Sequence, residues 1–587
     1  MPSPSAGSRA RSAMTPEKTH DSYIYDGLRG WRSYRPFRPG WGMYHDVKRR
    51  LPYYWSDITD AFTYRTFAST VRMYFVKSPS SCSGHTLDMY RRTGEFFGVN
   101  EAIFSSALAA MVVSILGAQP LTIVGITGLI SLFNYTIYDI ITQYDPSIYP
   151  QFMCWTAIWA AIFHWLVALW NMCDYMRYAT EFSSESFGMY VGIIYIEELV
   201  SEFSTKGTAA GYLSCMIAIL YFATIYALEK LGSSTIWKPW CRSILADYAY
   251  VELDVLSNGQ LVAFDTSPAD RHHILDGLFK YPWQSESRKY RPSTYNQSLL
   301  SYAASGLAAR LLGLDVKWVF VAIPFGFLIM LLFYYDHNVS SLTAQAREFP
   351  LKKPGGFHWD FFLLGCTTFI AGILGLPMPN GLAPQAPVHT DSLTVYETEL
   401  AIIATDEKEG AEVRRPIVNA VAVVEQTATY SLPYYTCSGV FFVVGWGSIE
   451  SNGIVGKLFF LFREDRFIQR DEPLLTISKR KICIYIGLQL VGVAACVAIS
   501  ETIAAIGFPI LICLLIPLRV LCLPKWFTQR ELEVMDDLIA NNKAVLASLG
   551  DAPRLPDGVE AEDYGLERRY LEHKRGVPRQ RAGSIHR

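Results

Sequence analysis

Long apolar runs recur along the chain, and most of them are too long to be strands. About 20 mostly apolar residues are enough for a helix to cross a bilayer, and runs near that length lie at Gln151–Met176, Ala209–Leu228, Val316–Tyr335, Ile482–Ser500 and Ile503–Leu523. Shorter apolar runs occupy Ala102–Gly117, Phe187–Val200, Phe361–Leu374 and Gly439–Ile449. The pattern predicts an all-α polytopic membrane protein, in which Glu197 and Glu198 end one of the shorter helices.

Two further apolar stretches are interrupted by glycine and proline. Gly117, Pro120 and Gly125 break up Ile115–Ile141, and Leu374–Tyr396 is interrupted in the same way. Each break begins with Leu-Gly, a weak internal similarity of the kind that an inverted repeat leaves. Backbone groups without helix partners are tolerated at membrane depth only where they face protein or a wet cavity. Two such breaks, one in each half, predict short helices that restart near the bilayer midplane beside a substrate site.

The residues at the two predicted restarts suit a small anion. A helix N-terminus presents unpaired amides and about half a positive charge, so two termini that face each other hold an anion without a fixed cation. Thr127 and Gly128 lie at the first restart, and Gln385, Ala386 and Pro387 at the second. Threonine is a good N-cap residue and proline suits the first helical turn, while the Gln385 amide suits a hydroxylated substrate.

Asp336 follows Trp318–Tyr335, a run that contains no charged residue. A carboxylate at membrane depth is costly and is therefore interpreted as functional. Beside an anion site it would take up a proton and couple proton binding to anion binding; alternatively, it marks the end of the helix at the interface. Two histidines are weaker candidates. His389 lies one turn after Gln385 on the same helical face, whereas His164 is typical of a satisfied interior histidine.

Composition supports the membrane assignment. Of 587 residues, 51% are hydrophobic and 18% are charged, against roughly 25% charged in soluble proteins. Residues 1–54 hold ten Lys/Arg and four acidic residues, so the positive-inside rule puts the N-terminus in the cytoplasm. The eleven cysteines are scattered, with no CxxC pair. We therefore expect no disulfide framework, metal site or cofactor, and no nucleic-acid partner.

The predicted organisation has five parts: a cytoplasmic tail (1–54), a first inverted repeat (55–250), a divergent linker (251–315), a second inverted repeat (316–523) and a cytoplasmic C-terminal tail (524–587). The first repeat ends in WKPWCRSILADYAY, whose mixture of Trp, basic and apolar residues is typical of an amphipathic helix at the interface. In the second repeat, 398–415 is acidic and is predicted to be a loop.

Long motifs carry a resemblance to a known family: LGAQPLTIVGITGLISLFNYTIYDI, FYYDHNVSSLTAQ and LGLPMPNGLAPQAPVHTDSLTV. They are similar to the bicarbonate/anion-exchanger superfamily, above all to its fungal and plant borate-transporter branch. The resemblance implies fourteen membrane segments in a seven-plus-seven inverted repeat, with core and gate domains, two half-helices at the midplane and usually a homodimer. It also implies that Asp336 is the acidic residue of the eighth segment near substrate. Gln385 stands where the animal chloride/bicarbonate exchanger has an arginine.

The resemblance stops and resumes abruptly in three places. VKSPSSCSGHT stands in the first segment, VELDVLSNGQLVAFDTSPADRHH stands where the seventh belongs, and the eleventh is missing around VVEQTATYSLPYYTCSG. We expect these segments to be degraded or missing, which is typical of an altered reading frame or splicing in a predicted gene.

The resemblance implies a secondary transporter of a small inorganic oxyanion in the lipid bilayer, with borate efflux across the plasma membrane, or alternatively the vacuolar membrane, as the leading hypothesis. A bicarbonate or inorganic anion exchanger of the same fold is the nearest alternative, and a non-transporting scaffold or receptor is a third. A membrane enzyme with Asp336 and His337 as a catalytic pair is disfavoured, because no HExxH or HxxxxD context surrounds them.

Overall fold

We describe a computed structural model of the chain. It describes residues 37–60, 89–232 and 313–549, apart from short gaps within the last two ranges, of which 424–439 is the longest. The predicted interfacial helix at 237–250, nearly all of the linker at 251–315, and most of the three stretches expected to be degraded lie outside the described residues.

Apolar helices make up most of the described structure. Four are long and apolar enough to cross a membrane: Pro146–Leu169, Val316–Ala344, Lys479–Ser500 and Ala504–Trp526. Shorter apolar helices span Glu101–Leu116, Gly128–Ile141, His358–Leu374 and Gly453–Phe462. The prediction of several apolar helical spans is therefore confirmed.

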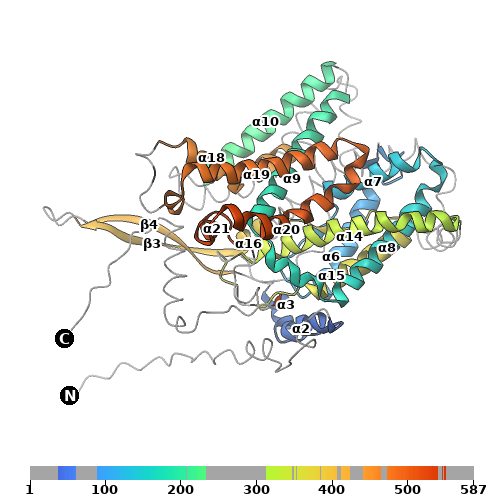
Figure 1. The fold of residues 1–587 in the computed structure, drawn as a ribbon, viewed down its shortest axis with the longest axis horizontal. Helices are drawn as coiled ribbons and strands as arrows, with labels where there is room; N and C mark the ends of the chain where they lie inside the picture. Colours follow the sequence, from blue (N-terminus) through green and yellow to red (C-terminus); the bar gives the residue numbers. More distant parts are fainter. Residues whose placement is uncertain are drawn as a thin grey trace, which may run out of the picture.

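One group of helices surrounds α14 (Val316–Ala344). Helix α8 (Tyr149–Leu169) packs against both α14 and α15 (His358–Leu374), and α6 (Val99–Leu116) packs against α15 (Figure 1). The approach of α14 to α8 depends on Gly326, because a Cβ atom there would lie 2.8 Å from the backbone nitrogen of Ala160. Short elements complete this group: β1 (Val124–Gly125), α7 (Gly128–Ile141), β2 (Asn380–Gly381) and α16 (Gln385–Leu393).

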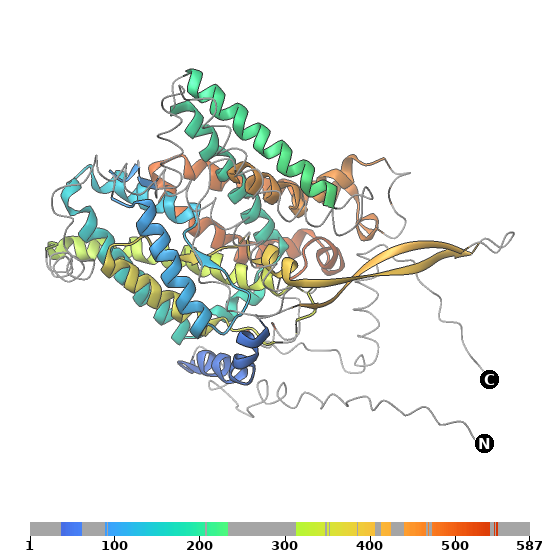
Figure 2. The same ribbon diagram turned by 180° about the vertical axis from the view of Figure 1, so that it is seen from behind.

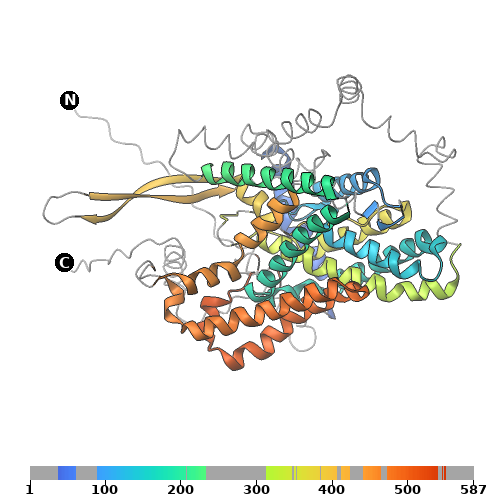
Figure 3. The same ribbon diagram turned by 90° about the horizontal axis from the view of Figure 1, so that it is seen from above.

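A second group of helices surrounds α9 (Glu181–Thr205). Helix α9 packs against α17 (Val440–Glu450), α19 (Lys479–Ser500) and α10 (Thr208–Gly232). Figure 3 shows α19 and α20 (Phe508–Trp526) side by side; α18 (Gly453–Phe462) and α21 (Gln529–Met535) complete the group. The prediction that Glu197 and Glu198 end a helix is wrong, since α9 continues to Thr205.

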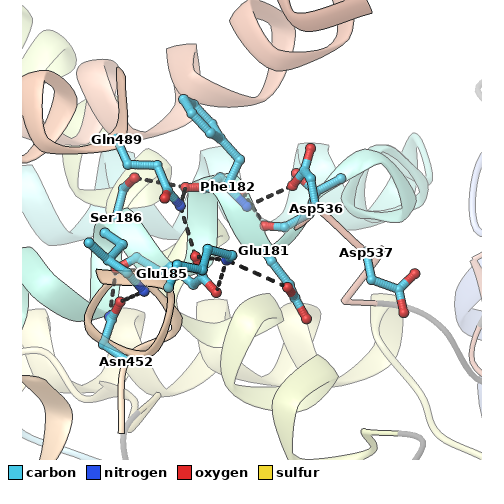
Figure 4. A network of polar contacts seen from close by, with 12 residues as sticks. Glu181, Phe182, Glu185, Ser186, Asn452, Gln489, Asp536 and Asp537 are labelled. Atoms are coloured by element: carbon cyan, nitrogen blue, oxygen red, sulfur yellow. Dashed lines mark hydrogen bonds and ion pairs between the residues drawn. The ribbon is translucent and has the colours of Figure 1, made fainter. Parts of the chain in front are cut away.

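A buried ion pair joins three helices of this second group (Figure 4). Lys457 Nζ of α18 lies 2.7 Å from both carboxylate oxygens of Glu185 on α9, and Gln489 Nε2 of α19 donates to Glu185 Oε2 at 2.9 Å. Asn452 caps α18 by accepting from the Ile454 N–H, and its Nδ2 donates to the Glu185 carbonyl at 2.8 Å. We call Glu185, Lys457, Gln489 and Asn452 the ion-pair network.

A β-hairpin replaces the acidic loop that the sequence predicts at 398–415. Strands β3 (Thr394–Thr405) and β4 (Glu412–Val423) pair antiparallel over nearly their whole length and project from the helices (Figure 2). Both strands are rich in β-branched residues, which suits extended structure, and this signal outweighs the acidic residues near the tip.

The short helix α2 (Trp41–Arg50) is fastened to the start of α15; α3 (Tyr54–Thr59) follows it. Asp46 Oδ2 accepts the backbone N–H groups of Phe357, His358 and Trp359 at 2.9–3.2 Å, so that Asp46 satisfies amides that α15 cannot pair within itself. Arg49 Nη2 lies 2.6 Å from Asp46 Oδ1 and completes the contact.

Candidate functional site

The two interrupted stretches meet in the structure. Strands β1 and β2 pair antiparallel, with Val124 opposite Gly381 and Gly125 opposite Asn380. Each break thereby supplies backbone partners for the other, which unwound chain needs in apolar surroundings. The sequence predicts that the breaks lie together, but it does not predict that they form a sheet.

The two breaks have the same order of elements, α6–β1–α7 and α15–β2–α16. Helix α15 ends at Gly375, whose φ of 72° lies in the left-handed region that favours glycine. Helix α7 begins at Gly128, after Thr127, whose side chain accepts from the Ile130 N–H at 3.3 Å. Helix α16 begins at Gln385. Both helices therefore restart where the sequence predicts.

One face of α14 is hydrogen-bonded to the breaks. Asn380 Nδ2, in the second break, donates to Asp336 Oδ2 at 2.7 Å. Hydroxyls further along α14 extend this contact, at Ser340 Oγ to the Leu382 carbonyl (3.3 Å) and at Ser341 Oγ to Thr122 Oγ1 (3.0 Å). Because positions four apart share a helical face, Asp336 and Ser340 present their polar groups to the same side.

The Asp336 carboxylate is enclosed by protein. The residue is 2% exposed, and no Lys or Arg among the described residues forms an ion pair with it. The alternative that Asp336 marks a helix end is wrong, because α14 continues to Ala344. A buried carboxylate that has hydrogen-bond donors but no cation partner in the described part of the chain is costly for folding alone, and this cost is typical of a functional group.

The predicted residues at the restarts are mostly buried. Gln385 is 7% exposed, and neither its Oε1 nor its Nε2 has a hydrogen-bond partner among the described residues. Such orphaned amides are rare in folded proteins. The other predicted residues are Thr127, Gly128, Ala386 and His389, all buried, and Pro387, which is half-buried. We call Asp336, His337, Asn380 and Gln385 the break site.

Beside the serines, two further polar residues that hold the breaks are not predicted from the sequence. Asp360, in the first turn of α15, accepts the N–H groups of Ala118 and Gln119 at 2.6 and 2.8 Å and so holds the start of the first break. Asn380 is the second. Its signal is visible in hindsight, since MPNG places one amide within an otherwise apolar break. Asp360 gives a weaker signal, because acidic residues are common in the first turn of any helix.

Comparison with known proteins identifies relatives of this chain. The family model described as "HCO3- transporter integral membrane domain" matches residues 36–212 and 204–540. The putative transporter C543.05c of Schizosaccharomyces pombe is 36% identical over 84% of this chain and 95% of its own length. Boron transporter 1 of Saccharomyces cerevisiae is also 36% identical, over 85% of this chain and 86% of its own length.

More distant proteins match as well. The Band 3 anion transport protein of Rattus norvegicus is 23% identical over 84% of this chain and 55% of its own length. The solved transmembrane domain of the cyanobacterium bicarbonate transporter BicA aligns with 78% of this chain and 97% of its own at 13% identity, with a TM-score of 0.39. The family match and the two fungal relatives establish that the chain is an integral membrane protein of the HCO3- transporter family, homologous to Boron transporter 1 of Saccharomyces cerevisiae.

Proposed function

We propose that the chain exports borate through the break site. The observation that carries the proposal is the buried Asp336 carboxylate, which is bound by Asn380 of the second break and has no cation partner among the described residues. The homology to Boron transporter 1 supports boron as the substrate.

In this proposal the substrate lies between the N-termini of α7 and α16. Thr127 and Gly128 provide one end, Gln385, Ala386 and Pro387 provide the other, and helix amides there attract negative charge. Asp336 takes up a proton when the oxyanion enters, so that two like charges do not coexist in one buried site. The unpartnered Gln385 amide is then satisfied by substrate hydroxyls.

Boron content of cells that lack a boron exporter tests this function. Cells that make the chain should hold less boron than vector controls at the same external concentration. Asp336→Asn should return boron to the vector level at equal surface expression. Asp315→Asn is the matched control, because Asp315 lies at the start of the same helix with its side chain 76% exposed. Boron at the vector level in cells that display the chain at their surface would contradict the proposal.

An inorganic anion exchanger of the same fold is the second candidate, and the match to Band 3 over most of this chain favours it. Flux of labelled bicarbonate into liposomes separates the two functions. A scaffold or receptor without transport is the third. Restoring residues 77–86 to the corresponding segment of the Schizosaccharomyces pombe relative tests it, since flux only in the restored chain would favour a non-transporting role for the chain as written.

We also propose the finer architecture of two inverted repeats, with a core domain around α14 and a gate domain around α9, in a homodimer in the plasma membrane or the vacuolar membrane. The matching orders α6–β1–α7 and α15–β2–α16 support the repeat. The antiparallel pairing of β1 with β2 supports it too, because a two-fold axis perpendicular to the strands makes equivalent strands run in opposite directions.

A further inference from the structure

The His337 side chain is buried, and no residue in the described part of the chain forms a hydrogen bond with its imidazole. It lies beside Asp336 on α14 and is 0% exposed, and neither Nδ1 nor Nε2 has a partner among the described residues. A neutral imidazole offers one donor and one acceptor. Leaving both unused in the interior destabilises the folded state. Packing alone gives no reason to keep a histidine at this position.

His337 lies against the second break. A Cβ atom on Gly381 would lie 2.9 Å from His337 Cα and 3.0 Å from its Nδ1. Gly381 is the β2 residue that pairs with Val124 of the first break. His337 therefore lies close to the backbone at the point where both breaks meet, within the site that already holds Asp336 and Asn380.

A second histidine near this point shows what an anchored imidazole looks like. His164 of α8 lies with Nδ1 2.6 Å from the Ala160 carbonyl of its own helix, and its ring stacks on Phe361 at 4.6 Å. His337 also packs against Phe361, at 6.2 Å between ring centres, but no carbonyl in the described part of the chain accepts from it. Of the two, His337 is the ring whose nitrogens both remain available.

We propose that His337 is a substrate-binding residue that hydrogen-bonds a hydroxyl group of a boron oxyacid at the paired breaks. This inference rests on the proposed function and deepens it. Boric acid and borate carry B–OH groups that each donate and accept, which matches the donor and acceptor of a neutral imidazole. Chloride cannot donate, so a site of this kind discriminates against it by leaving a buried acceptor unpaired.

Boric-acid binding to the purified full-length chain in detergent tests the inference. The melting temperature is measured over a boric acid series, because a ligand that binds only the folded state raises it. His337→Phe keeps the ring and removes both nitrogens. We expect its apparent affinity to fall at least about tenfold, with the melting temperature without ligand preserved. His337→Gln should recover part of the affinity, which a packing role would not explain.

The outcomes are separable. Equal affinities of wild type and His337→Phe overturn this inference and leave the proposed function intact. A wild-type chain that melts cooperatively but gives no boric-acid response overturns both. If His337→Phe does not fold, His337→Leu takes its place, because wild-type affinity of a folded variant with neither donor nor acceptor at this position would contradict the role.

A second variant crowds the space beside His337 without replacing the histidine. The methyl group of Gly381→Ala would crowd His337 Cα and Nδ1, so we expect the boric-acid response to be lost. Gly487→Ala is the matched control, since a Cβ atom there meets nothing within 4 Å. Binding by Gly381→Ala with wild-type affinity would show that His337 does not contact the ligand at this backbone.

Discussion

Two buried polar regions of this molecule hold carboxylates in opposite ways. In the ion-pair network, Glu185 has Lys457 at 2.7 Å, and both side chains are nearly excluded from solvent, with exposures of 12% and 8%. In the break site, Asp336 is 2% exposed and has the Asn380 amide as a partner, with no ion pair in the described part of the chain. One region neutralises its charge with protein and the other does not.

In the function proposed above, the difference separates groups that hold the fold from groups that bind a ligand. A buried ion pair has a cost that its partners offset, and the network joins α9, α18 and α19 through it. The break site keeps polar atoms of His337 and Gln385 without described partners, although satisfying them would stabilise the protein. Folding alone does not favour that arrangement, whereas binding of a hydroxylated substrate does.

The largest expected effect on stability comes from breaking the ion pair. Lys457→Met leaves the Glu185 carboxylate buried without a cation, which should lower the free energy of unfolding by about 3–5 kcal/mol. The double variant Lys457→Met/Glu185→Met removes both charges and should recover most of the loss. Melting temperatures measured in the same detergent rank the stabilities of wild type, the single variant and the double variant. A single variant as stable as wild type would contradict a structural role for the pair.

Asp46 is a third buried carboxylate. Like Glu185, it has a cation and hydrogen-bond donors as partners, which predicts a structural role. Asp46→Asn weakens charge-assisted bonds to three amides at the start of α15 and should cost about 1.5–3 kcal/mol. Transport per folded molecule should be unchanged. Reduced flux without reduced melting temperature would instead join Asp46 to the functional region.

The pH dependence of stability tests the same residue. Burial acts to raise the pKa of Asp46, but the hydrogen bond and charge of His358 and the charge of Arg49 outweigh it, so the pKa lies below its usual 3.8. A lowered folded pKa means that the stabilisation is present above about pH 4 and is lost as the pH falls through the folded pKa. The melting difference between wild type and Asp46→Asn should therefore shrink below pH 4. A constant difference would exclude this linkage.

The sequence predicts where the two breaks lie better than it predicts the contacts that hold them. Glycine and proline mark both breaks because backbone conformation is a local property, and Asp336 stands out against an uncharged helix. The pairing of β1 with β2 is a contact between chain segments more than 250 positions apart. Strands of two residues are too short to show the alternating pattern by which a strand is predicted from sequence. The Lys457 pair is missed too, although a lone cation in GIVGKLFFLF is the same signal as Asp336.

Two helix caps, one in each region, allow the regions to be compared through substitutions of similar and smaller expected effect on stability. Thr127 caps α7 in the first break and Asn452 caps α18 in the ion-pair network. Each change to Ala should cost about 1 kcal/mol. We expect Thr127→Ala to lower boron flux per folded molecule and Asn452→Ala to leave it unchanged, with Thr127→Ser as the control that keeps the capping oxygen. Equal effects of the two changes on flux would remove the functional distinction between the regions.

The smallest expected effect on stability belongs to the residue with the largest expected effect on transport. Asp336→Asn keeps the volume of the side chain and removes a buried charge that has no ion-pair partner among the described residues, so the melting temperature should be no lower than that of wild type, even though boron export is lost. Asn380 can still hydrogen-bond the new amide oxygen. A fall as large as that of Lys457→Met would mean that the Asp336 carboxylate holds the breaks together rather than serving the substrate. Measured beside Lys457→Met in the same detergent, this variant therefore decides whether an unpaired buried carboxylate in this fold is a structural cost or a functional group.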